Sequence, residues 1–207
     1  MNKLSVQIVA VLAFVGIALG ALYYGGVFGN SQNGEISQTE RTARQVEILK
    51  YSDYSCPACA AYAPLEKQLK AEFGDMVQFG YRHFPLESFP HSELAAYAAE
   101  AARNQGKFLE MHDMLFNRQQ EWSPAQANAK QIFMDYAEML ELDLEQFEAD
   151  LDNEEVHARV ESNLQEGIRR QVNATPTYFV DGHKIRQNPQ SYEQFKSIVE
   201  LYMYRNN

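Results

Sequence analysis

The sequence predicts an α/β fold in which a small mixed sheet is flanked by helices and interrupted by a helical subdomain. Apolar residues alternate over 45–52 and 76–84, which is typical of strands, and a helical pattern over 56–73 lies between them. A long block at about 92–172 is rich in Ala, Glu, Gln and Leu and contains only two glycines and one proline. That composition predicts several helices inserted between the two halves of the sheet.

Helix signals are clear in the segment after the first strand. Leu65, Leu69 and Phe73 recur at helical spacing and predict one apolar face. Pro57 suits the first helical position, where a missing N–H costs no hydrogen bond, and Gly74 is a stop signal. We therefore expect a single helix that ends at Phe73 and is followed directly by the second strand.

The C-terminal part is predicted to complete the sheet. Residues 177–180 form a short β-rich run, Asp181-Gly182 is a strong hairpin turn, and 183–187 are expected to return as the partner strand. Asn188-Pro189 is expected to open the last helix. Its apolar residues recur at helical spacing and predict packing against the sheet: Phe195, Ile198, Val199 and Tyr202.

Residues 1–28 predict a membrane segment. No charged residue occurs in 4–28, the run is long enough to cross a hydrocarbon core, and Lys3 marks the side that stays in the cytoplasm. Ala18-Leu19-Gly20 offers a signal-peptidase site, whereas the length and the Tyr23-Tyr24 pair favour a retained transmembrane helix. We expect an anchored protein, with secretion after signal cleavage as the alternative. In both cases the rest of the chain lies outside the cytoplasm, in the cell envelope or periplasm.

The remaining chain divides into a linker and one domain. Residues 29–43 are rich in Gly, Asn, Gln, Ser and Thr and predict a flexible linker. Residues 44–207 are enough for one domain with a real core, which we expect to be monomeric. The net charge of −10 argues against a nucleic-acid partner, because phosphate binding needs a basic surface.

Cys56 and Cys59 are the only cysteines in the 207 residues, and they lie at the predicted helix start. There the free backbone N–H groups and the helix dipole favour a thiolate over a thiol, which lowers the pKa of Cys56 and makes it the attacking group. Cys59, one turn later, is placed to resolve the resulting mixed disulfide. The spacing therefore predicts a redox-active pair outside the cytoplasm, where disulfides persist.

A cysteine pair with this spacing has two other possible uses, a zinc site and a structural disulfide. A closed zinc site needs four ligands, and the sequence has no second cysteine pair. A purely structural disulfide across so short a loop would remove little entropy from the unfolded chain. Both alternatives are therefore less favoured than a redox function, and no bound metal is expected.

Several motifs together resemble the thioredoxin superfamily. They are the Cys-x-x-Cys at a helix start, Pro64 eight residues beyond its first cysteine, and Thr175-Pro176 just before a strand. The helical insert is similar to that of the DsbA-like branch. Within this branch, three further motifs resemble membrane-anchored disulfide oxidoreductases: Phe84-Pro85-Leu86, Gln105-Gly106-Lys107-Phe108 and Met111-His112-Asp113. The resemblance covers nearly all of 46–204 and implies a thioredoxin-like fold.

The resemblance also implies roles for individual residues. Cys56 would form the mixed disulfide, Cys59 would resolve it, and Pro176 would be a cis-proline facing both cysteines. The backbone of Thr175 would pair with an extended substrate segment, and Pro57 and Ala58 would contact the same substrate. No cofactor is implied.

Two positions depart from the family pattern. Lys50 stands six residues before the first cysteine, where related proteins carry a buried acid. The proton acceptor for Cys59 is then missing, or supplied by Asp53 or by water. Ala58 stands where strongly oxidising relatives carry a histidine. Because alanine cannot stabilise the Cys56 thiolate, we expect a milder oxidant than DsbA itself.

The sequence thus predicts an extracytoplasmic thiol–disulfide oxidoreductase that donates disulfides to secreted or periplasmic protein thiols. The resemblance implies that a DsbB-like, quinone-linked membrane partner reoxidises it. A disulfide reductase or isomerase of the same fold is the nearest alternative. A Cu(I)-binding assembly factor or chaperone that uses the two thiols as soft ligands is the alternative from another class of protein.

Overall fold

The computed structural model describes residues 42–205. The predicted membrane segment and nearly all of the predicted linker lie outside these residues. Within the described part, no helix is both long and apolar enough to cross a membrane.

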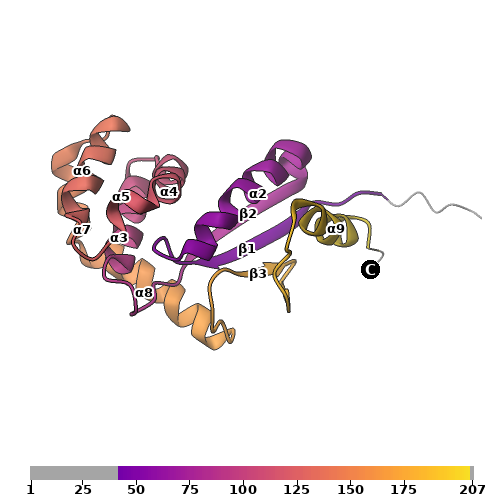
Figure 1. The fold of residues 1–207 in the computed structure, drawn as a ribbon. Helices are drawn as coiled ribbons and strands as arrows, with labels where there is room; N and C mark the ends of the chain where they lie inside the picture. Colours follow the sequence, from indigo (N-terminus) through magenta and orange to yellow (C-terminus); the bar gives the residue numbers. More distant parts are fainter. Residues whose placement is uncertain (1–41, 206–207) are drawn as a thin grey trace, which may run out of the picture. The chain divides into compact units, whose positions relative to one another are not determined.

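A four-stranded mixed sheet forms the centre of the domain (Figure 1). Its strand order is β2-β1-β3-β4. β1 (Val46–Ser52) runs parallel to β2 (Val77–His83) and antiparallel to β3 (Thr177–Val180). β4 (His183–Lys184) pairs antiparallel with β3 at the far edge. The parallel pair requires a crossover connection, and the helix over Pro57–Phe73 supplies it.

Two helices cover one face of this sheet. α2 (Pro57–Phe73) and α9 (Tyr192–Met203) are amphipathic, and each buries an apolar stripe. Leu69 and Phe195 belong to the same cluster of buried side chains as Val46, Ile48, Tyr178 and Val180 of the sheet. A short 3-10 turn, η1 (Gly74–Met76), connects α2 to β2.

The opposite face is covered by α8 (Glu154–Arg169) (Figure 1). Leu49, Tyr51 and Phe179 form the apolar surface of the sheet on this side. Gly167 permits the close approach of the helix, because a Cβ at this position would lie 2.7 Å from the Phe84 ring. A larger residue there would force the helix away from the sheet.

The predicted helical insert is present between β2 and β3. It has its own core, in which an alanine-rich helix packs against Trp122, Phe133 and Phe147. Both cysteines belong to this cluster, so the insert packs directly against the start of α2. Besides α8, the insert consists of α3 (Ser92–Asn104), α4 (Phe108–Asn117), α5 (Gln119–Trp122), α6 (Ala129–Met139) and α7 (Leu144–Leu151).

Two C-terminal predictions were wrong in their boundaries. The last helix begins at Tyr192 after the Ser191 cap, and not at Asn188-Pro189. The Asn188 amide donates to the Pro176 carbonyl at 2.7 Å, and the Tyr62 hydroxyl donates to the Pro189 carbonyl at 2.8 Å. These tertiary contacts hold the segment as a loop, and the second strand of the hairpin is correspondingly short.

Candidate active site

The two cysteines lie at the N-terminus of α2. Cys56 is the N-cap with an extended backbone (φ −74°, ψ 118°), and Pro57 occupies the first turn. Both cysteines are free thiols. Cys56 retains 8% of its accessible surface and Cys59 none, whereas Pro57 and Ala58 between them are exposed. A partner molecule can therefore reach the Cys56 sulfur, and Cys59 lies behind it.

The environment of Cys56 stabilises its thiolate. A hydrogen bond from the Cys59 side chain is the largest cause, and it lowers the pKa of Cys56 to about 5, although burial acts in the opposite direction. The Thr175 side chain and the backbone N–H groups of Ala58 and Cys59 lower it further. These N–H groups are the free donors expected at a helix N-terminus.

The environment of Cys59 has the opposite effect. Burial raises the pKa of the Cys59 thiol well above its ordinary value, and the neighbouring Cys56 raises it further. The positive charge of Lys50 acts against both. At neutral pH the pair therefore holds one thiolate, on the accessible sulfur, and one thiol, on the buried sulfur.

We predict that the reduced protein titrates with a midpoint near pH 5 when thiolate absorbance at 240 nm is followed. The folded pKa of Cys56 is depressed from 9.0 to about 5. Its contribution to the stability of the reduced form is therefore complete above about pH 9 and is lost as the pH falls through 5. The oxidised protein lacks this group and is the control. A midpoint above pH 8 in the reduced protein would contradict the assignment.

The segment before β3 faces the same site. The Thr175–Pro176 peptide bond is cis, as the resemblance implied. The Cys56 sulfur lies 3.6 Å from the Thr175 carbonyl oxygen. Because a carbonyl can only accept, this contact belongs to the thiol form of Cys56. The Thr175 hydroxyl is buried and has no other hydrogen-bond partner among the described residues, so it is available to the Cys56 thiolate.

Lys50 forms a buried ion pair. It is completely buried, and its Nζ lies 2.7 Å from Oε1 of Glu66, which is 2% exposed. Tyr178 donates to the same carboxylate oxygen at 2.5 Å. The buried acid beside Lys50 thus comes from α2. The pair lies beneath Cys59, whose pKa responds to the Lys50 charge.

Asp53 is buried in the active-site loop and makes several hydrogen bonds. Its carboxylate accepts from the backbone N–H groups of Ser55 and Leu86 and, through both oxygens, from the Ser92 hydroxyl. Burial raises its pKa, although these hydrogen bonds oppose the shift. The side chain therefore ties the active-site loop to the start of the helical insert.

Two buried residues of the site were missed by the sequence reasoning. Glu66 lies seven residues after Cys59 and so shares its helix face; this spacing was the available signal. The Gln119 amide donates to the backbone carbonyls of Tyr54 (2.6 Å) and Cys56 (3.0 Å). No sequence signal pointed to Gln119, because its contacts cross more than 60 residues.

Comparisons with known proteins give the family. A family model described as thioredoxin matches residues 38–201. Parts of two Na⁺/H⁺ antiporters named NhaA also match: one from Herminiimonas arsenicoxydans is 39% identical over 69% of this chain, and one from Salinispora tropica is 34% identical over 74%. The match spans 22% of each antiporter. The chain belongs to the thioredoxin family.

Several solved structures have a similar fold. A thioredoxin-like oxidoreductase from Silicibacter pomeroyi is 25% identical, with a TM-score of 0.63 over 77% of this chain and 87% of its own. BdbD from Bacillus subtilis is 23% identical and has a TM-score of 0.68, over 76% of this chain and 87% of its own. Alpha-DsbA1 from Wolbachia pipientis is 15% identical and has a TM-score of 0.68, over 78% of this chain and 86% of its own. The described domain therefore has the same fold as these thioredoxin-like and DsbA proteins.

Proposed function

We propose that this chain is an extracytoplasmic disulfide donor for secreted or periplasmic proteins, and that Cys56 and Cys59 carry the exchanged disulfide. The observation that carries the proposal is the division of the pair into an accessible cysteine with a pKa of about 5 and a buried one whose pKa is raised. A low nucleophile pKa stabilises the reduced form, and this makes the disulfide form oxidising.

The cycle starts from the Cys56–Cys59 disulfide. A substrate thiolate attacks the Cys56 sulfur, the bond to Cys59 breaks, and Cys59 leaves with the electron pair and takes up a proton. A second substrate thiolate then attacks the substrate sulfur of the mixed disulfide, so that Cys56 leaves as a thiolate. The substrate has lost two electrons, and the enzyme is a dithiol. A DsbB-like, quinone-linked partner in the membrane accepts these two electrons and restores the disulfide.

The surrounding residues have separate roles in this proposal. Pro57 and Ala58 are exposed beside Cys56 and contact the substrate, and the backbone beside Pro176 pairs with an extended substrate segment through Thr175. Lys50 stabilises the departing Cys59 thiolate by its charge. Glu66 is a positioning residue, because its ion pair holds the Lys50 ammonium beneath the cysteines.

The direction of electron flow is tested by the reduction potential of the pair. The Cys56 pKa of about 5 lies between the values of roughly 3.5 for DsbA and 7 for thioredoxin. Those proteins have potentials of about −120 and −270 mV, so we expect roughly −180 mV for this chain. Equilibration of the full-length protein against glutathione, with quantification of free thiols, measures it. A value near −270 mV would favour a reductase and contradict the disulfide donor.

The proposed location agrees with this chemistry. A disulfide donor needs an oxidising compartment and a reoxidising partner. The predicted anchor at residues 1–28 would keep the domain at the outer surface of the cytoplasmic membrane, close to a quinone-linked partner.

A further inference from the structure

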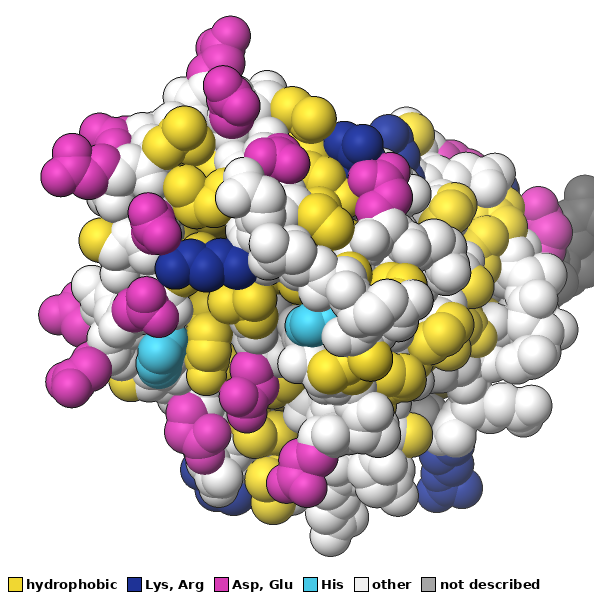
Figure 2. Space-filling model, turned by 60° about the vertical axis from the view of Figure 1, so that its left-hand side comes forward, with side chains coloured by type: hydrophobic (Ala, Val, Ile, Leu, Met, Phe, Trp, Pro, Cys, Tyr) yellow, Lys and Arg dark blue, Asp and Glu magenta, His cyan; other side chains and the backbone are white. Residues whose placement is uncertain are grey.

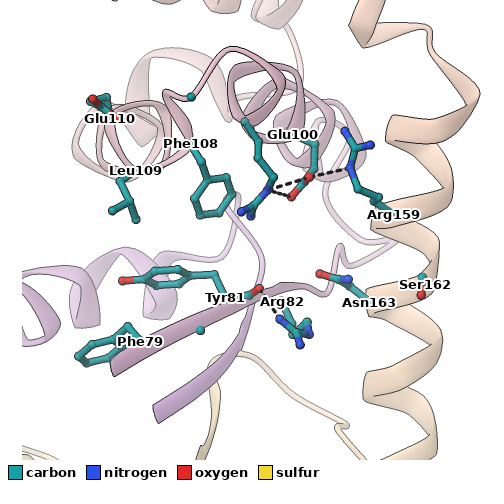
Figure 3. A pocket seen from close by; sticks show the side chains of 13 residues that line it. Phe79, Tyr81, Arg82, Glu100, Phe108, Leu109, Glu110, Arg159, Ser162 and Asn163 are labelled. Atoms are coloured by element: carbon teal, nitrogen blue, oxygen red, sulfur yellow. Dashed lines mark hydrogen bonds and ion pairs between the residues drawn. The ribbon is translucent and has the colours of Figure 1, made fainter. Parts of the chain in front are cut away.

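A cavity of the described domain opens along the outer edge of β2. It has a volume of about 780 Å³ and is lined by β2, α3, α4 and α8. Figure 3 shows Phe79 and Tyr81 on one side, Phe108 above them, and Arg159, Ser162 and Asn163 opposite. Neither cysteine contributes to this lining.

The cavity exposes unpaired backbone groups of a strand. β2 is an edge strand among the described residues. The N–H of Phe84 points inward to the Ser52 carbonyl (2.9 Å), whereas the N–H of His83 points outward to Asn163 Oδ1 (3.1 Å). Because backbone groups alternate in direction along a strand, those of Phe79 and Tyr81 also face outward. Asn163 thus satisfies the last outward N–H, and the Tyr81 carbonyl accepts from Nη1 of Arg82 at 3.2 Å. The outward N–H groups of Phe79 and Tyr81 have no hydrogen-bond partner recorded among the described residues, so they are available to a ligand.

The same cavity carries excess positive charge. Arg103 and Arg159 share one carboxylate, Glu100, and each donates to it through Nε at 3.0 Å. Burial raises the pKa of Glu100, but the hydrogen bond and charge of His83 and the charges of the arginines lower it to about 2. Glu100 is therefore ionised, and its one negative charge faces two guanidinium groups. The two other charged residues of the lining, Arg82 and Glu110, are each paired with a residue outside it, Glu166 at 2.8 Å and Lys107 at 3.2 Å.

The arginines also keep free donors. Their side chains are 45% and 37% exposed, and the terminal N–H groups of Arg103 have no hydrogen-bond partner among the described residues. Nη2 of Arg159 donates to Asn104 Oδ1 at 2.8 Å, whereas its Nη1 has no recorded partner among these residues. The Arg103 guanidinium stacks 3.6 Å from the Phe108 ring centroid, which fixes its plane. On the face of the helical insert shown in Figure 2, by contrast, acidic side chains predominate, and the whole chain has a net charge of −10.

We infer that this cavity binds an extended polypeptide segment with an acidic side chain, which adds as a strand to the edge of β2. The backbone of the segment would pair with Phe79 and Tyr81, and its carboxylate would accept from the terminal N–H groups of Arg103 and Arg159. The aromatic rings beside the strand accommodate its apolar side chains. Charge complementarity selects an acidic segment over a basic one.

The test uses the full-length protein and a fluorescent, cysteine-free pentapeptide of threonine and valine with one central glutamate. Anisotropy at low ionic strength measures its binding. Ser162→Glu adds a negative charge to the cavity wall without removing any hydrogen bond recorded for the described residues, and Ser162→Gln is the size-matched control. We expect the first variant to bind roughly tenfold more weakly and the second to bind as the unmodified protein does. Arg103→Gln is expected to weaken binding as Ser162→Glu does.

Two altered peptides test the ligand class. A lysine in place of the glutamate is expected to abolish measurable binding, because it removes the carboxylate that the arginines bind. N-methylation of the backbone amides is expected to do the same, because it removes the hydrogen bonds to β2. Binding that Ser162→Glu and Arg103→Gln leave unchanged would overturn the site. Equal binding of the N-methylated peptide would overturn strand addition. Displacement of the unmodified glutamate peptide by glycerol 3-phosphate would indicate that the cavity binds a phosphate headgroup and not a polypeptide. All these outcomes are readable in a Cys56→Ser/Cys59→Ser background.

Discussion

Replacement of Cys56 by serine is expected to abolish disulfide donation, whereas the same replacement at Cys59 is expected to trap the protein on its substrate. Cys56 carries the accessible thiolate at the N-terminus of α2. A serine hydroxyl stays protonated at neutral pH and cannot form a disulfide. We expect a loss of more than roughly 1,000-fold in the rate of oxidation of a reduced substrate protein, the scale on which removal of a nucleophile lowers enzyme rates.

Cys59→Ser is the matched control, because it makes the same atomic change three residues further along α2. The variant keeps the attacking Cys56 thiol but has no resolving thiol. With an activated disulfide substrate it is expected to form one stable mixed disulfide per molecule, visible by mass spectrometry. If instead Cys59→Ser turned over and Cys56→Ser accumulated the mixed disulfide, the proposed roles of the two cysteines would be reversed.

Removal of the Lys50 charge is expected to produce the largest loss of stability. In Lys50→Met, the Glu66 carboxylate stays buried with only the Tyr178 hydroxyl as a partner. Breaking one half of a buried ion pair costs about 3–5 kcal/mol in the free energy of unfolding, which urea denaturation of the full-length protein measures. The double variant Lys50→Met/Glu66→Gln removes both charges and is expected to recover part of this loss.

The matched control is the exposed pair of Lys130 and Glu148, whose charged atoms lie 3.1 Å apart on α6 and α7. Lys130→Met is expected to change stability by less than about 1 kcal/mol, because solvent screens the pair. If Lys50→Met were as stable as this control, the buried ion pair between Lys50 and Glu66 would be contradicted.

The same double variant separates stability from catalysis. Lys50 lowers the pKa of Cys59, so its removal disfavours the Cys59 thiolate even where the fold is restored. We expect the step that releases or uses this thiolate to slow by roughly tenfold, which corresponds to about one pKa unit. The pKa of Cys56, followed by absorbance at 240 nm, serves as the internal control. A double variant with full exchange activity would leave Lys50 with a structural role only.

Local patterns of the sequence were sufficient to predict most of the strands and helices of the fold. The predicted strands 45–52 and 76–84 appear as β1 and β2 with boundaries shifted by one residue, and 177–180 is β3 as predicted. Alternation of apolar side chains, a proline at the helix start and a glycine at its end act over a few residues, so they can be recognised without the fold. The predicted start of α9 was wrong because Asn188 and Pro189 form hydrogen bonds with residues that are distant in the sequence.

The two cysteines could be predicted as a redox-active pair without the fold, because they stand one turn apart at a predicted helix start, where the backbone favours a thiolate. The residues that surround this pair became visible only in the folded chain. The Lys50–Glu66 pair, the Gln119 contact with the active-site loop and the cavity at the edge of β2 all join residues from different elements. Burial and charge at these positions depend on the whole path of the chain, which no short pattern records.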